Sequence, residues 1–176
     1  PAPGIIVIHG GGGLGPQAKK RADMLAELGY AAFAPDLFGE PIKGVDHAKA
    51  VVKQFTENYG ELRRRCQAGL DVLNKQPNVD TKRSAAIGFC FGGQAALEFA
   101  RSGVDLKAVV GFHSQLSTAR PQDSADIKGK VLICLGDRDC FVSKEDRDAF
   151  MENMTASKVD CQLMLFSGVC HSFTDP

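Results

Sequence analysis

Short apolar runs alternate along the chain with longer amphipathic stretches, and this alternation predicts the secondary structure. The run Ile5-Ile6-Val7-Ile8 has no polar interruption and is β-branched throughout, which is typical of a central strand covered on both faces. Similar runs predict further strands at residues 30–34, 84–87, 106–111, 130–135 and 160–166. Apolar residues at helical spacing predict helices between them, at residues 16–28, 45–56, 61–75, 94–101 and 144–154.

Strands that are separated by helices predict a mostly parallel sheet with helices on both faces, a three-layer α/β sandwich. Residues 35–44 contain two prolines and two glycines and should form a loop at the carboxyl end of the second strand. No repeat or linker divides the chain, so we expect one domain over residues 1–176. Because the chain begins at Pro1 and ends soon after its last motif, we expect this domain to be shortened at one or both ends.

A glycine-rich hexapeptide, Gly88-Phe89-Cys90-Phe91-Gly92-Gly93, lies between the third predicted strand and the next helix. It predicts a sharp turn with Cys90 at its tip, because glycines two residues before and after the tip remove side chains that would collide there. Such a turn is the nucleophile elbow of the α/β-hydrolase fold, whose tip residue points into a cleft. A cysteine at the tip indicates covalent catalysis by a thiolate.

Composition and charge restrict the partners of this chain. Apolar residues make up 44% of it, and 21 basic side chains balance 21 acidic ones, so no positive field would attract nucleic acid. No apolar run is long enough to span a membrane, and we expect a soluble, cytoplasmic protein. The six cysteines form no C-x-x-C pair, which argues against a metal site and fits reduced thiols. We expect no cofactor, no membrane partner, and a monomer or weak homo-oligomer.

Polar residues that directly follow the predicted strands should meet at one edge of the sheet, where sites of this fold class form. They include Cys90 after the third strand, Asp137 and Asp139 after the fifth, and His171 after the sixth. Nucleophile, acid and base thus occur in the chain order that α/β-hydrolases use. In these roles His171 takes the thiol proton of Cys90, and a carboxylate, with Asp139 as the candidate, orients the imidazole.

Backbone amides and one further histidine complete the candidate site. A tetrahedral oxyanion needs two hydrogen-bond donors, and the N–H groups of Phe91, at the helix start, and Gly11, after the first strand, are the candidates. His113 follows the fourth strand and either lines the cleft or makes a structural hydrogen bond. We assign substrate contact to Gly10 and His113.

These segments together resemble the dienelactone hydrolase family. The resemblance lies in the elbow, in Leu135-Gly136-Asp137-Arg138-Asp139-Cys140-Phe141-Val142, in His171-Ser172-Phe173 and in residues 30–39, and it extends in consistent order over nearly the whole chain. It implies the α/β-hydrolase fold and cleavage of a small-molecule ester or lactone through an acyl-enzyme. The Cys-Asp-His triad of the family falls on Cys90, Asp139 and His171, with Asp139 rather than Asp137 as the acid.

The chain departs from the family pattern around this triad. Gly10 stands where the family has a glutamate near the resting thiol, and Asp175 stands where it has an arginine that holds the substrate carboxylate. Family members also continue into a C-terminal helix beyond the position of Pro176. The resemblance therefore implies the mechanism and leaves the substrate open, with lactones and activated esters expected to react better than amides.

Two other functions fit part of the sequence. Gly10, Gly12 and Gly15 form a G-x-G-x-x-G loop between a strand and a helix, and Asp36 follows the last glycine by 21 residues, as in a dinucleotide-binding Rossmann-type domain. That alternative leaves the elbow unexplained. A non-catalytic binding module with the α/β-hydrolase fold is the other alternative.

Overall fold

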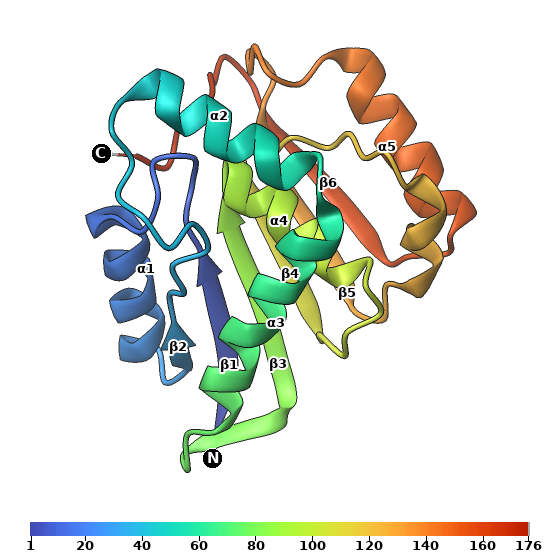
Figure 1. Ribbon diagram of the computed structural model, residues 1–176. Coiled ribbons are helices and arrows are strands. Elements are labelled where there is room, and N and C mark those ends of the chain that lie inside the picture. Colours follow the sequence, from blue (N-terminus) through green and yellow to red (C-terminus); the bar gives the residue numbers. More distant parts are fainter. Residues whose placement is uncertain (176) are drawn as a thin grey trace.

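The computed structural model describes residues 1–175, so Pro176, the last residue of the expected domain, lies outside the described residues. Within this range the strands form one parallel sheet in the order β2-β1-β3-β4-β5-β6 (Figure 1). The strands are β1 (Ala2–Ile8), β2 (Ala31–Phe33), β3 (Val79–Phe89), β4 (Ala108–Phe112), β5 (Lys130–Gly136) and β6 (Cys161–Phe166). All of the strands predicted from the apolar runs are present.

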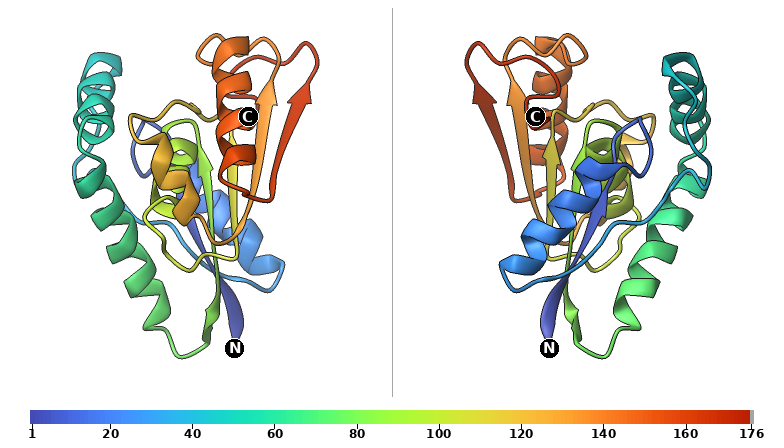
Figure 2. Two further views of the ribbon diagram at one scale, coloured as in Figure 1. Left: turned by 90° about the vertical axis from the view of Figure 1, so that its right-hand side faces the viewer. Right: turned by 90° about the vertical axis from the view of Figure 1, so that its left-hand side faces the viewer.

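Helices cover both faces of the sheet, which confirms the predicted three-layer sandwich (Figure 2). They are α1 (Pro16–Glu27), α2 (Val45–Thr56), α3 (Tyr59–Asn74), α4 (Phe91–Ala100) and α5 (Lys144–Ala156), with a 3₁₀ helix, η1 (Pro121–Asp126), before β5. Helix α1 packs on one face, and the other helices pack on the opposite face. None of the described helices is both long and apolar enough to cross a membrane.

The central strand β1 shows why the first apolar run has no polar residue. Ile6 and Ile8 belong to the larger core, under α2 to α5, whereas Ile5 and Val7 belong to the smaller core, under α1. Full burial of an aliphatic side chain of this size contributes about 1.5–3 kcal/mol. Both faces of β1 are therefore fixed by packing, and the loop that follows it begins from a rigid position.

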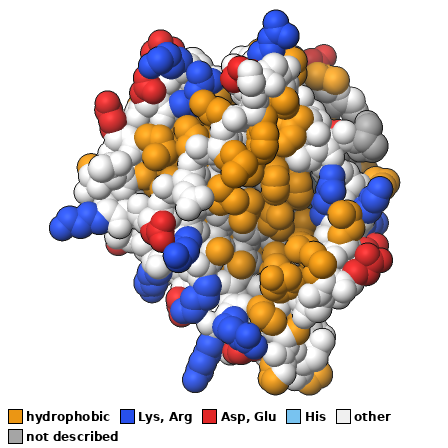
Figure 3. Space-filling view, turned by 180° about the vertical axis from the view of Figure 1, so that it is seen from behind, with side chains coloured by type: hydrophobic (Ala, Val, Ile, Leu, Met, Phe, Trp, Pro, Cys, Tyr) orange, Lys and Arg blue, Asp and Glu red, His pale blue; other side chains and the backbone are white. Residues whose placement is uncertain are grey.

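Helix α1 covers only part of its face of the sheet. The strand register places Phe112, Cys134 and Met164 side by side on this face, and Figure 3 shows apolar side chains gathered across it. Met164 is 47% exposed and Phe166 is 36% exposed. Strands β4 to β6 thus have apolar residues on both faces, although the described helices pack on only one of them here.

Helix α4 is buried along its whole length, and an ion-pair network holds it in place. Glu98 of α4 is fully buried and accepts hydrogen bonds from Arg101 and from Arg63 of α3, both at 2.8 Å. Arg63 also pairs with Asp123 of η1 at 2.7 Å. Because a buried charge without a partner is strongly destabilising, this network fixes α4, and with it the turn that precedes α4.

The start of α4, at the site, and the start of β3, at the opposite edge of the sheet, differ from those predicted. Helix α4 begins at Phe91 rather than at residue 94, because Gly92 and Gly93 are part of its first turn. Strand β3 begins at Val79 rather than at residue 84, and its polar first half pairs with Ala2 and Pro3 of β1. That extension has exposed polar side chains, which is why no apolar run indicated it.

Candidate active site

The turn between β3 and α4 places Cys90 at the carboxyl edge of the sheet. Cys90 has φ of 55°, a left-handed conformation that is uncommon for a residue with a side chain. The glycines around it are required by close packing: a Cβ on Gly88 would collide with the backbone of Gly92, and a Cβ on Gly92 would collide with the carbonyl oxygen of Ile8. The strand-turn-helix connection predicted from the hexapeptide is therefore formed, with α4 directly against the end of β1.

His171 and Asp139 come from the loops after β6 and β5, and they form a hydrogen bond. Nδ1 of His171 lies 2.8 Å from Oδ2 of Asp139, whose other oxygen accepts the backbone N–H of Phe141 at 2.9 Å. Asp137 is exposed and instead accepts the backbone N–H of Gly168 at 2.7 Å. The carboxylate beside the imidazole is thus that of Asp139, and Asp137 stabilises a loop.

Cys90 and His171 perturb each other's ionisation. Burial raises the pKa of the Cys90 thiol, but the neighbouring His113, His171 and backbone N–H of Phe91 outweigh burial and lower this pKa from 9.0 to about 6. Burial lowers the pKa of His171, but Cys90 and Asp139 outweigh it and raise this pKa from 6.5 to about 9. Both shifts favour the thiolate form of Cys90 and the imidazolium form of His171 at neutral pH.

His113 lies beside both groups. Its ring centroid is 4.9 Å from that of His171, and its Nε2 lies 2.8 Å from the hydroxyl oxygen of Thr174. The ring also lines the cavity that opens beside Cys90. The two alternatives left open for His113, cleft lining and a structural hydrogen bond, are thus both observed.

The loop after β1 is held by a buried histidine, His9, to which the sequence analysis gave no role. Its Nε2 accepts the backbone N–H of Leu37 at 3.1 Å, so Nδ1 carries the proton and donates to the carbonyl oxygen of Gly10 at 2.8 Å. Burial lowers the pKa of His9, which keeps the ring neutral. Because C=O and N–H point in opposite directions across a trans peptide, fixing the Gly10 carbonyl also fixes the direction of the N–H of Gly11.

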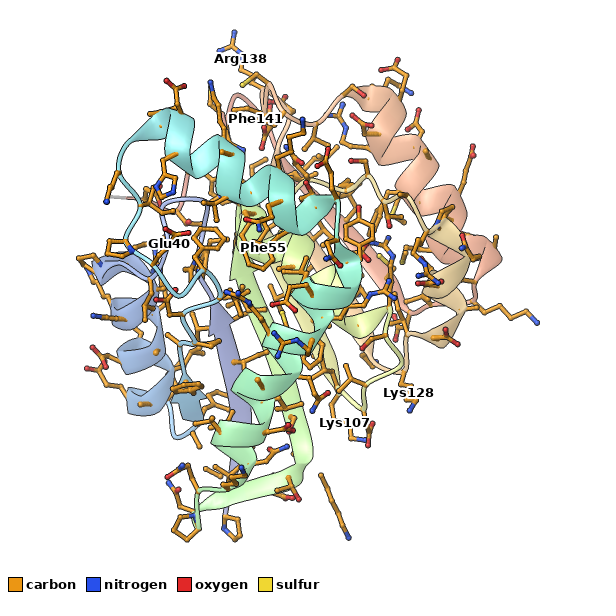
Figure 4. The ribbon with its side chains drawn as sticks, viewed as in Figure 1. Glu40, Phe55, Lys107, Lys128, Arg138 and Phe141 are labelled. Carbon is orange, nitrogen blue, oxygen red and sulfur yellow. The ribbon has the colours of Figure 1, made fainter. Side chains whose placement is uncertain are left out.

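A cavity of about 800 Å³ opens beside Cys90. Its walls combine the glycine loop after β1 with apolar side chains, which include Val45, Val52, Phe89 and Phe141. Figure 4 shows Phe141 in the loop above the carboxyl edge of the sheet, while Arg138 of the same loop points away into solvent. No lysine or arginine among the described residues lines the cavity, and its charged groups are His171 and Asp175.

Comparison with known proteins assigns the chain to a family. The sequence model of the dienelactone hydrolase family matches residues 1–176. The chain belongs to the dienelactone hydrolase family. Protein usf of Aquifex pyrophilus is 30% identical over 177 residues, which cover 97% of this chain and 76% of that protein. A carboxymethylenebutenolidase homolog of Xenopus tropicalis is 26% identical over 162 residues, which cover 90% of this chain and 64% of that protein.

A solved structure supports the same assignment. The crystal structure of a dienelactone hydrolase-like promiscuous phosphotriesterase from metagenomic libraries matches with a TM-score of 0.94 and 40% identity, over 100% of this chain and 74% of that one. The resemblance stated from the sequence and the α/β-hydrolase fold are thus confirmed. Membership in the dienelactone hydrolase family makes the chain a hydrolase of the ester and lactone class.

The glycine loop of this dienelactone hydrolase family member does not favour the dinucleotide alternative. Gly10 and Gly12 line the same cavity as Cys90. The carboxylate of Asp36 accepts the backbone N–H groups of Phe38 and Gly39, each at 3.1 Å, so it stabilises its own loop. Among the described residues, no group of three or more His, Cys, Asp or Glu side chains is arranged to hold a metal ion.

The departures from the family pattern at residues 10 and 175 both lie at the cavity. A Cβ on Gly10 would be 3.6 Å from Cβ of Cys90, so residue 10 is adjacent to the thiol but offers it no carboxylate. Asp175 accepts a hydrogen bond from Gln17 of α1 at 2.6 Å, which fixes a negative charge at the cavity lining. An anionic substrate group would be repelled there.

Proposed function

We propose that this hydrolase cleaves ester or lactone bonds through a thioester on Cys90, with His171 as the acid and base and Asp139 as the residue that orients His171. The observation that carries the proposal is the hydrogen bond of 2.8 Å between Asp139 and His171, beside a thiol whose pKa is lowered to about 6 at the tip of a nucleophile elbow. A thiol that is ionised at neutral pH and faces a cavity is ready to attack a carbonyl group.

In the first half of the reaction, the thiolate of Cys90 adds to the carbonyl carbon, and the π electrons of the carbonyl move to its oxygen. The backbone N–H groups of Phe91 and Gly11 donate hydrogen bonds to this oxyanion. When the carbonyl re-forms, the bond to the alcohol oxygen breaks, and that oxygen takes the proton of the His171 imidazolium. In a lactone the released alcohol stays attached to the acyl group.

In the second half, neutral His171 takes a proton from a water molecule, and the water oxygen adds to the thioester carbon. Collapse of this adduct breaks the C–S bond and releases the carboxylic acid and the thiolate. His171 is an imidazolium again, as at the start, and Asp139 stabilises this charged form in both halves.

The lining of the cavity is suited to a neutral, partly apolar substrate. Val45, Val52 and Phe141 contribute apolar surface to it, and Asp175 disfavours a substrate carboxylate. A thiolate is a good leaving group, so the adduct of an amide returns to the substrate, whereas an activated ester or lactone proceeds. Short-chain neutral esters and unsubstituted lactones are therefore the substrates that we infer.

Phosphotriesters are a second candidate substrate class. The protein that is 40% identical over the whole chain is described as a promiscuous phosphotriesterase. A phosphotriester is neutral and fits the absence of basic side chains from the described cavity lining. The test is the release of p-nitrophenol from diethyl p-nitrophenyl phosphate by the wild-type chain and by Cys90→Ala.

Turnover of p-nitrophenyl acetate by cysteine variants tests the main proposal. Cys90→Ala should abolish turnover, whereas Cys140→Ala, which removes an exposed thiol, should leave it unchanged. Turnover by folded Cys90→Ala equal to that of the wild type would contradict the proposal. A folded chain without ester turnover and without a preferentially reactive thiol would favour a binding module, and a thermal shift on adding NAD or FAD would favour the dinucleotide alternative.

A further inference from the structure

The register of the sheet brings His113 to the elbow. Phe89 at the end of β3 pairs with Phe112 at the end of β4, and the backbone N–H of Cys90 donates to the carbonyl oxygen of Phe112 at 3.0 Å. Cys90 and His113 are thus the residues that leave two neighbouring strands at the same level. His113 has φ of 40°, and its own N–H donates to the carbonyl oxygen of Cys134 at 2.9 Å, so the direction of its side chain is fixed.

The His113 ring is buried and has one unused nitrogen. Only 1% of the residue is exposed, Nε2 is 2.8 Å from Oγ1 of Thr174, and Nδ1 is a buried atom without a hydrogen-bond partner among the described residues. Leaving a buried polar atom unpaired is costly, so such an atom calls for an explanation. The cavity that holds Cys90 is the space that this ring lines.

The hydrogen bonds of Thr174 are compatible with the tautomer in which Nδ1 of His113 carries the proton. The side-chain amide of Gln17 donates to Oγ1 of Thr174 at 3.4 Å, so the hydroxyl hydrogen of Thr174 is free to point at Nε2 of His113. In that tautomer Nε2 accepts from the hydroxyl and the proton is on Nδ1. The unused nitrogen is then a donor without an acceptor among the described residues.

We propose that His113 stabilises the thiolate form of Cys90. In this role Nδ1–H of His113 donates a hydrogen bond to the Cys90 sulfur. His171, whose ring centroid lies 4.9 Å from that of His113, is the group that takes the thiol proton. This role deepens the proposed function, on which it rests, because the same bond stabilises the thiolate as it leaves in the second half of the reaction.

The charges around His113 agree with this role. His171, which is hydrogen-bonded to Asp139, is the cationic group at the sulfur, whereas Arg21 of α1 donates to the backbone oxygen of Thr174. Asp175 is held by Gln17. The other groups packed on the ring are aromatic, namely Phe89 and Phe173. The proximity of His113 also lowers the pKa of Cys90.

A pair of substitutions of equal shape tests the role of His113. His113→Asn keeps an N–H close to the position of Nδ1 and tolerates positive φ, whereas His113→Leu has the same branching and no donor. The rate of alkylation of Cys90 by iodoacetamide is measured against pH, with the Cys90 peptide followed by mass spectrometry. His113→Leu should raise the apparent pKa of Cys90 by about one unit or more, with at least a tenfold loss of thiolate at low pH, and His113→Asn by less than about half a unit.

An unchanged Cys90 profile in folded His113→Leu, or equal shifts in both variants, would overturn the proposal. Should His113→Leu fail to fold, Thr174→Val and Thr174→Ser replace it: the valine removes the hydroxyl that fixes the tautomer and should raise the pKa of Cys90, whereas the serine should not. Equal profiles for these two variants would overturn it as well. Alkylation needs no ester turnover, so a failure here is distinct from turnover by Cys90→Ala, which contradicts the proposed function itself.

Discussion

Gly92→Ala perturbs the packing that directs Cys90 into the cavity. Gly92 lies in the first turn of α4, and a Cβ on it would overlap with the carbonyl oxygen of Ile8 and lie 2.5 Å from that of His9. Ordinary contacts of a Cβ begin at about 3.4 Å, so the start of α4 must move by roughly 1 Å. Both obstacles are backbone atoms at the end of the central strand, and they cannot rotate away as a side chain could.

The magnitude follows from these distances. Overpacking of this kind costs about 1–3 kcal/mol of folding free energy, which lowers Tm by roughly 2–12 °C in a domain of this size. A displacement of about 1 Å at a reacting group costs on the order of 10²-fold in rate. We therefore expect kcat/KM for p-nitrophenyl acetate to fall about 100-fold at a temperature at which the variant is still folded.

Gly60→Ala is the matched control. The nearest atom to a Cβ on Gly60 is Oδ1 of Asn58 at 3.5 Å, an ordinary contact, and Gly60 lies in α3 away from the cavity. Alanine favours the helix by up to about 1 kcal/mol, so Tm should be equal or slightly higher and kcat/KM unchanged. The reasoning is refuted if Gly92→Ala has the Tm and the kcat/KM of the wild type. It is also refuted if Gly60→Ala loses as much Tm and kcat/KM as Gly92→Ala.

The ionised pair and the buried network give further expectations. For alkyl esters, kcat/KM should fall below about pH 6, as Cys90 gains a proton, and above about pH 9, as His171 loses one; a flat steady-state profile would contradict this. Asp139→Asn should lower kcat roughly 10²–10⁴-fold because the imidazole loses its orienting charge, and near-wild-type turnover would exclude that role. Glu98→Ala leaves Arg101 buried without the carboxylate that pairs with it, so the free energy of unfolding measured in urea should fall by about 3–5 kcal/mol. A fall of less than about 1 kcal/mol would contradict the stabilising role of this ion pair.

Much of the fold could be predicted because β1 is buried on both faces and its pattern is unambiguous. The elbow could be predicted for a similar reason, since only glycine fits at Gly88 and Gly92. The first half of β3 could not, because its pairing with β1 is made by backbone groups and, after buried Val79, its side chains are polar and mostly exposed. Strand β6 was predicted, but its apolar pattern does not reveal its exposure, since Met164 is apolar although 47% exposed.

The candidate site could be predicted as far as topology determines it. In a parallel sheet the carboxyl ends of β5 and β6 meet, so Asp139 and His171 were expected to lie near each other although 32 residues separate them. No comparable topological rule predicts the hydrogen bonds that support these residues. The contact of His113 with Thr174 spans 61 positions and depends on how the last loop folds back, and the tautomer of His9 depends on one backbone N–H.

The central claim is that the acyl group of the substrate is transferred to the sulfur of Cys90. Wild-type protein mixed with a p-nitrophenyl ester and quenched with acid within one turnover should carry one acyl group, and peptide mass spectrometry should locate it on the peptide that contains Cys90. His171→Ala should slow the loss of this acyl group, because it lacks the base that activates water. Turnover with no acyl group on Cys90 at any quench time, or with the acyl group on another residue, would contradict the account.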